Sequence, residues 1–242
     1  MAEDESPASD SARTLSAMDR AFLTGDAEAG EVVLVRHGQQ QYPEPGTKDF
    51  SKWIDPPLSK VGLRQAEAVG RHLSLRPVTA VYSSRLERAF VTGQAIAEHH
   101  HLEVVVDDRL REIEMFRDLP PGKTSPADAF GAEALARAQE EFVATRRWSA
   151  YPGSESAAEL RARVDAALGE ILAAHPAEVV VVACHGGVIN ALLAPLLGID
   201  EDMFFRPAHT SVHRLAFKGD RRVIGALNEI SHLEPADELL TW

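Results

Sequence analysis

Two histidine–glycine pairs each follow a short run of β-branched residues in this sequence. His37-Gly38 comes after residues 31–35, and His185-Gly186 comes after residues 179–183. Such runs are typical of strands that are buried on both faces of a sheet. Because ligands in open α/β sheets bind beyond the carboxyl ends of the strands, we expect the two imidazoles to meet at one edge. The glycines would let the backbone approach a ligand closely.

Two arginines accompany these histidines and indicate an anionic ligand. Arg36 precedes the first histidine, and Arg85 follows a further predicted strand at residues 80–83. A guanidinium matches the oxygens of a phosphate and keeps its charge. A neutral imidazole is a competent nucleophile near pH 7, and a second, partly protonated one can stabilise the oxygens of a phosphoryl group. A carboxylic acid would still be needed to protonate the leaving oxygen.

The elements that must position these residues alternate along the chain. Beyond the strands named above, we predict a strand at 104–106, helices over about 59–74, 85–99, 126–147, 156–174 and 187–197, and a C-terminal hairpin with strands at 211–217 and 222–227. This alternation is typical of the α/β class, a mostly parallel sheet with helices on both faces.

Two segments differ from this alternation. Residues 1–29 are rich in Ala, Ser, Asp and Glu and lack a sustained apolar face. We predict a mostly disordered acidic tail there, with a helical turn near residues 18–23. Residues 30–242 are predicted to form a single domain, in which the irregular segment at about 114–152 is a small helical insertion that closes over the cleft.

Composition excludes several classes of function. The net charge of −12 argues against a nucleic-acid partner. No run approaches the roughly 18–20 apolar residues of a membrane span, so we expect no membrane partner. Cys184 is the one cysteine, and residues 1–5 lack the features of a secretory signal, so we expect a cytoplasmic location.

Other histidines and Cys184 suggest weaker hypotheses. A cysteine-dependent phosphatase motif, Cys-x₅-Arg, would need an arginine where Asn190 stands, so Cys184 is interpreted as a small buried residue. The run 99–101 of three histidines is interpreted as a solvated helix end, and we predict no metal and no cofactor. His209 could come near the cleft, but a structural role is preferred.

Four separated motifs resemble, in the same order, those of the histidine phosphatase superfamily, the phosphoglycerate mutase-like enzymes. They are Leu34-Val35-Arg36-His37-Gly38-Gln39, Asp55-Pro56-Pro57-Leu58-Ser59 with Gly62 and Gln65-Ala66, Val81-Tyr82-Ser83-Ser84-Arg85-Leu86-Glu87-Arg88-Ala89 with Thr92, and Cys184-His185-Gly186-Gly187-Val188-Ile189. The similarity covers about 31–113 and 153–217.

The resemblance implies a role for each matching residue. His37 would become the phosphohistidine, while Arg36, Arg85 and His185 would bind the phosphoryl group. Further substrate contacts are expected from Gly38, Gln39 and Gly186. The family often has its general acid in a Leu-x-Glu setting, which implies Glu112, with Glu114 as the alternative.

Departures from the mutase pattern favour hydrolysis. Residues 40–43 read Gln-Gln-Tyr-Pro where the mutases have an Asn, and residues 153–156 read Gly-Ser-Glu-Ser instead of Gly-Gly-Glu-Ser. A mutase must keep water out, whereas a phosphatase must admit it. We therefore predict a phosphomonoesterase that acts on a small phosphorylated substrate, with specificity in 39–57 and 113–155. The alternatives are a phosphoglycerate mutase-like phosphotransferase and a catalytically weak module that binds a phospho-ligand. The oligomeric state is left open, with a homodimer as one option.

Overall fold

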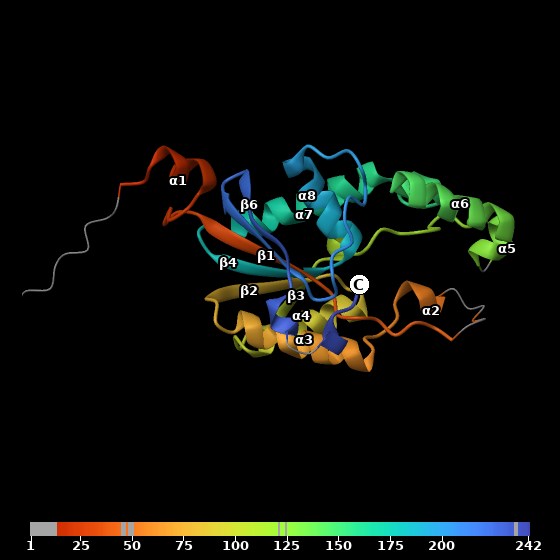
Figure 1. The fold of residues 1–242 in the computed structure, drawn as a ribbon, viewed down its shortest axis with the longest axis horizontal. Helices are drawn as coiled ribbons and strands as arrows, with labels where there is room; N and C mark the ends of the chain where they lie inside the picture. The colour runs from red at the N-terminus through yellow and green to blue at the C-terminus, as the bar shows by residue number, and fades with distance from the viewer. Residues whose placement is uncertain (1–13, 45–46, 48–50, 121, 124, 235–236) are drawn as a thin grey trace, which may run out of the picture.

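A six-stranded mixed sheet forms the centre of the molecule (Figure 1). The computed structural model describes residues 14–44, 47, 51–120, 122–123, 125–234 and 237–242. The strand order is β3-β2-β4-β1-β5-β6. The strands are β1 (Gly30–Arg36), β2 (Val78–Ser83), β3 (Val104–Val106), β4 (Val179–Cys184), β5 (Val212–Lys218) and β6 (Arg221–Glu229). The first four are parallel and the last two form an antiparallel hairpin, so the predicted α/β fold with a mostly parallel sheet is confirmed.

Helices cover both faces of the sheet (Figure 1). Helices α7 (Ala157–Ala174) and α8 (Gly186–Leu197) pack on one face, and α3 (Lys60–Leu73) and α4 (Glu87–Glu98) pack on the other. Alternate side chains of β1 point to opposite sides, because successive strand residues face opposite ways: Val32 and Leu34 join the α7/α8 core, while Val33 and Val35 join the α3/α4 core. Burial on both faces explains the continuous apolar run in β1.

The register of the central strands brings both histidine pairs to the same edge. Strand β1 pairs in parallel with β4, with Val35 opposite Ala183 and Arg36 opposite Cys184. His37 and His185 are the next residues on each strand, so they leave the sheet side by side. The expected convergence of the two strand ends follows directly from this register.

Two long helices begin at side-chain caps that the sequence contains. Ser59 accepts a hydrogen bond from the Gly62 N–H and starts α3, and Ser156 forms a capping box with Glu159 at the start of α7. Helix α8 is almost entirely apolar, and residues 186–194 are all buried, since it packs against both the sheet and α7.

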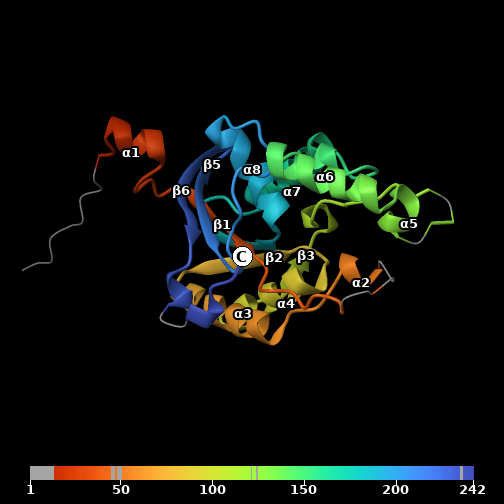
Figure 2. The same ribbon diagram turned by 45° about the vertical axis from the view of Figure 1, so that its right-hand side comes forward.

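The segment 114–152 contains two helices instead of the single one expected. Helix α5 (Pro126–Phe130) ends at Gly131, because a φ of 82° is incompatible with a continuous helix. Helix α6 (Ala132–Thr145) begins directly after it. Both extend away from the sheet (Figure 2). The remaining short elements are α2 (Ser51–Ile54) and four 3-10 helices, η1 (Asp108–Leu110), η2 (Trp148–Ala150), η3 (Ser231–Leu233) and η4 (Asp237–Leu239).

Residues 14–29 of the expected disordered tail are held against the C-terminal hairpin. Helix α1 (Ala17–Phe22) lies close to the expected helical turn and begins with a capping box at Ser16. The Arg221 guanidinium donates to backbone carbonyls of α1, and Lys218 forms a 3.0 Å ion pair with Asp26. These contacts join residues almost 200 positions apart, and composition does not reveal them. Residues 1–13 of the predicted tail lie outside the described residues.

No helix in the described ranges combines the length and the apolar character that a bilayer crossing requires.

Candidate active site

His37 is a buried, neutral imidazole whose two ring nitrogens have different hydrogen-bond roles. Its Nδ1 lies 2.7 Å from the Gly38 carbonyl oxygen, and because a carbonyl only accepts, Nδ1 is the protonated nitrogen. The lone pair is therefore on Nε2, which accepts a 3.3 Å hydrogen bond from Arg88 Nε. Burial holds the pKa of His37 well below its usual value, and the positive charges of Arg88 and Arg36 lower it further. The Nε2 nitrogen is therefore uncharged near neutral pH.

The loop after His37 is fixed against α3 and α4. The Gly38 N–H donates to Thr92 Oγ1 at 3.1 Å, and the Gln39 N–H donates to Gln65 Oε1 at 2.7 Å. A Cβ on Gly38 would lie 2.5 Å from the Gly62 carbonyl oxygen, so the close approach of α3 requires glycine here. The Gln39 side chain accepts from Ser59 Oγ at 2.8 Å. Both residues hold the loop, and their expected contact with substrate stays a prediction.

His185 is the second imidazole, and it is fully buried. It directly follows β4 at the N-cap of α8, and its ring centroid lies 5.1 Å from that of His37. Neither ring nitrogen has a hydrogen-bond partner within the described part of the chain. Burial, with the charges of Arg88 and Arg36, holds the pKa of His185 well below its usual value. Near pH 7 this imidazole is therefore neutral, in contrast to the partial protonation expected from the sequence.

Arg36 also faces the site with an unused donor. Its Nη1 donates to the Pro207 carbonyl oxygen, while Nε is buried and has no partner among the residues the structure describes. Burial lowers the pKa of Arg36 to about 10, so it remains charged near neutral pH.

The structure brings Arg88, and not the predicted Arg85, to His37. Arg88 is 5% exposed, and its guanidinium also donates to the Ile54 carbonyl oxygen at 3.1 Å. The Arg85 side chain is 57% exposed and forms an ion pair with Asp108. Arg85 lies ahead of α4, whereas Arg88 lies in its first turn, four residues before Thr92 on the buried face. This i, i+4 spacing with Thr92 was the signal in the sequence that could have identified Arg88.

The Glu112 carboxylate lies at the N-terminus of α8. Its Oε2 accepts from the Gly187 N–H at 3.2 Å, and its Oε1 accepts from the Ile113 N–H at 3.0 Å. A Cβ on Gly187 would lie 2.3 Å from Glu112 Oε1, so glycine leaves room for this carboxylate. The alternative acid, Glu114, is instead paired with Arg111 at 3.1 Å. The geometry therefore favours Glu112 over Glu114 as the group that can exchange a proton with a ligand.

A buried ion pair fixes the backbone that leads to Glu112. Arg163 donates to both carboxylate oxygens of Glu155 at 2.6 and 2.7 Å, and Glu155 is 2% exposed. The same guanidinium donates to the carbonyl oxygens of Arg109, Arg111 and Glu112. The position of Glu112 is therefore set by α7, a long-range dependence that local sequence patterns do not reveal.

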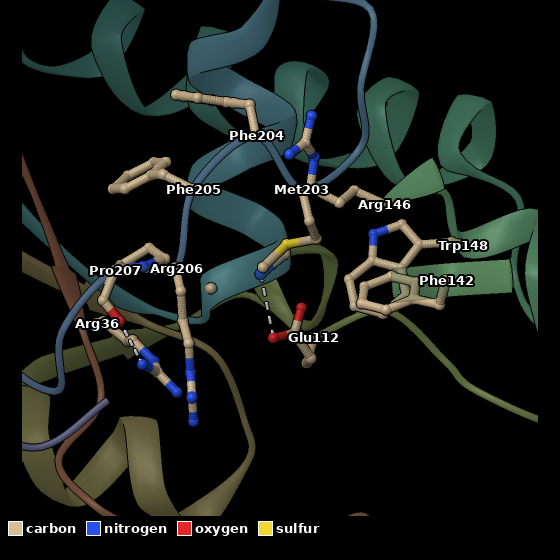
Figure 3. Close-up of a pocket in the computed structure, with 12 residues that line it drawn as sticks. Arg36, Glu112, Phe142, Arg146, Trp148, Met203, Phe204, Phe205, Arg206 and Pro207 are labelled. Atoms are coloured by element: carbon tan, nitrogen blue, oxygen red, sulfur yellow. Dashed lines mark hydrogen bonds between the residues drawn. The ribbon is translucent and has the colours of Figure 1, made fainter. Parts of the chain in front are cut away.

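A pocket of about 510 Å³ adjoins these groups (Figure 3). Glu112 points into it, and Arg36 and Arg206 lie side by side on its other flank. The pocket has aromatic, methionine and charged walls; its lining consists of Arg36, Glu112, Phe142, Arg146, Trp148, Gly186, Gly187, Met203, Phe204, Phe205, Arg206 and Pro207. Phe142, Arg146 and Trp148 come from the segment 114–152, and Gly186 also lines the pocket. That this segment closes over the cleft and that Gly186 contacts substrate stay predictions.

Cys184 is fully buried in the α7/α8 core, and burial raises the pKa of its thiol. Over the described ranges, no group of three or more His, Cys, Asp and Glu side chains is arranged to hold a metal ion.

Comparison with known proteins identifies the class to which this fold and site belong. Residues 32–230 match the model of the histidine phosphatase superfamily, branch 1. The chain belongs to this superfamily, as the sequence motifs indicated.

Individual relatives have names of two kinds. Phosphoserine phosphatase 1 of Hydrogenobacter thermophilus is 32% identical over 211 residues, which cover 84% of this chain and 94% of the relative. Phosphoglycerate mutase-like protein 4 of Arabidopsis thaliana is 32% identical over 225 residues, covering 88% and 91% of the two chains. Among solved structures, a mycobacterial glucosyl-3-phosphoglycerate phosphatase in complex with inorganic phosphate is 27% identical with a TM-score of 0.65, covering 84% of this chain and 99% of the other.

Proposed function

We propose that this protein is a phosphatase that hydrolyses a small phosphate monoester through a phosphohistidine on His37. The observation that supports this most strongly is the state of the His37 ring, with Nδ1 bound to the Gly38 carbonyl and Nε2 directed at Arg88. A neutral Nε2 between buried cationic groups suits attack on a phosphorus atom whose oxygens those groups bind. The phosphatase names of two relatives agree with this activity.

In the first step, Arg88 exchanges its hydrogen bond to His37 Nε2 for one to a phosphoryl oxygen, and the freed Nε2 lone pair attacks phosphorus. The N–P bond forms and the P–O bond to the leaving group breaks. Arg36, Arg88 and His185 donate hydrogen bonds to the oxygens of the transferring group. Protonated Glu112 gives its proton to the leaving oxygen, which departs as an alcohol. Arg88 takes the role that the sequence assigned to Arg85.

In the second step, water attacks the phosphohistidine from the side that the alcohol has left. The Glu112 carboxylate takes a proton from this water, the N–P bond breaks, and inorganic phosphate is released with His37 neutral again. One carboxyl group thus acts first as acid and then as base.

The pocket beside Glu112 is the proposed site of the leaving group. Phe142, Trp148 and Met203 give it apolar walls, and Arg206 adds a cation on the flank near Arg36. We therefore propose a small phosphomonoester whose alcohol part has apolar surface. The cytoplasmic location, the lack of a metal or cofactor and the oligomeric state stay predictions.

Release of inorganic phosphate from a panel of substrates tests this function. The panel contains phosphoserine, phosphoglycerates, sugar phosphates, nucleotides and an aryl phosphate, and the wild-type chain is compared with His37→Asn and with the control His99→Ala on an exposed helix end. We expect phosphate release by the wild type and by His99→Ala, and its loss in His37→Asn. Transfer between substrate hydroxyls that depends on a bisphosphorylated primer, with little free phosphate, would identify a mutase instead. Binding of phosphate without turnover would identify a binding module.

A further inference from the structure

A third histidine, His209, lies beside His37. It is 1% exposed, precedes β5 and places its ring centroid 5.8 Å from that of His37. Its Nδ1 lies 2.8 Å from Thr241 Oγ1, whereas its Nε2 is buried and has no partner in the described part of the chain. A buried polar atom without a partner is rare in folded proteins and is often explained by a ligand that the site binds.

The hydrogen bonds around Thr241 favour one of the two tautomers of His209. Gln65 Oε1 accepts from the Gln39 N–H, which fixes the orientation of the amide. Its Nε2 then donates to the Leu239 carbonyl oxygen at 2.6 Å and to Thr241 Oγ1 at 2.8 Å. The Thr241 hydroxyl proton needs an acceptor of its own, and His209 Nδ1 lies 2.8 Å away as an acceptor, so this arrangement favours an unprotonated Nδ1. The proton of a neutral His209 is then placed on Nε2.

His209 remains uncharged near neutral pH. Burial, with the nearby charges of Arg36 and Arg206, lowers the pKa of His209 to about 3. It therefore offers a single N–H donor of fixed position. The buried donors nearby that also lack partners among the described residues belong to Arg36 and His185.

We propose that His209 is a further phosphate-binding residue, whose Nε2–H donates to the phosphoryl group held between His37 and His185. Thr241 and Gln65 are positioning residues that keep the proton on Nε2. The loop after the nucleophile and the C-terminal residues 239–241 are then parts of one hydrogen-bond network. This inference rests on the proposed function, because it places the phosphoryl group at the same site.

Two substitutions of His209 distinguish a ligand donor from a structural role. In His209→Gln the side-chain amide nitrogen can reach the position of Nε2, while in His209→Asn it reaches only that of Nδ1. Binding of inorganic phosphate to the full chain is measured by calorimetry, with thermal unfolding in parallel. We expect His209→Asn to weaken phosphate binding by about 10- to 100-fold, as for a lost hydrogen bond to a charged group, and His209→Gln to retain most of the affinity. Thr241→Val should weaken binding several-fold, and Thr241→Ser should restore it.

Equal losses in His209→Gln and His209→Asn, or unchanged binding in His209→Asn, would overturn the proposal. The readout is independent of turnover. A wild-type chain that binds phosphate but hydrolyses no ester contradicts the proposed function alone, and the comparison of His209 variants then still decides the role of His209. A wild-type chain that does not bind phosphate contradicts both.

Discussion

Arg88 and Arg85 lie three residues apart, yet their surroundings differ completely. One guanidinium is buried and donates to the proposed nucleophile, and the other is half-exposed and bound to an aspartate. An exposed ion pair contributes little to stability, whereas a positioned cation in a buried site acts strongly on a phosphoryl group. The pair therefore provides a matched test of which arginine binds phosphate.

Arg88→Gln is expected to reduce kcat/KM by about 100- to 1000-fold, the usual cost of removing one positioned donor. Arg85→Gln is expected to change it by less than about threefold. Steady-state kinetics with an aryl phosphate measures both. Similar losses of kcat/KM in the two variants would show that Arg85 also acts on the phosphoryl group.

At the level of elements, the carboxyl ends of β1 and β4 and the N-termini of α4 and α8 deliver the reacting groups to one place. Glu112 reaches this place through a loop that Arg163 holds by three backbone carbonyls. Its proposed role as an acid can be tested with different leaving groups, because a good leaving group departs without a proton.

Glu112→Gln should therefore slow the hydrolysis of alkyl phosphates far more than that of activated aryl phosphates. Glu114→Gln, which alters a carboxylate bound to Arg111, is the control and should affect both substrates little. The ratio of kcat/KM for the two ester types is the measurement. An equal loss on both esters in Glu112→Gln would remove this residue as the acid.

Local patterns in the sequence predicted the elements well, but the contacts between them less well. Runs of β-branched residues and the cap at Ser59 are local signals, and the strands and α3 follow them closely. Arg88 could be found only by asking which face of α4 is buried. His209 is bound by Thr241 near the end of the chain. The backbone at Glu112 is bound by Arg163 of α7. Neither contact follows from spacing along the chain.

At the scale of the whole molecule, a chain with a net charge of −12 surrounds a site of buried histidines and arginines. Four histidines are buried within the described residues: His37, His185, His209 and His213. Burial is the first cause of the lowered pKa of each. The unfolded chain, with ordinary histidines, therefore binds more protons than the folded one below a pH of about 6.5.

The free energy of unfolding is accordingly expected to decrease as the pH falls from about 7 to about 5, with a slope that steepens below about pH 6.5 toward a limit of about 1.4 kcal/mol per pH unit for each such histidine. This window lies above the range in which most carboxylates titrate, so the histidines dominate it. Urea unfolding at several pH values measures the slope. A flat profile would show that these imidazoles titrate alike in the folded and unfolded chain.

The most direct test of the account is the fate of the phosphoryl group during a single turnover. Brief incubation with a substrate labelled in its phosphoryl group, followed by alkaline quenching and mass spectrometry of peptides, should find acid-labile, base-stable label on His37 and none in His37→Asn. Ester hydrolysis that proceeds with no label on the protein, or with label on another residue, would contradict covalent transfer through His37.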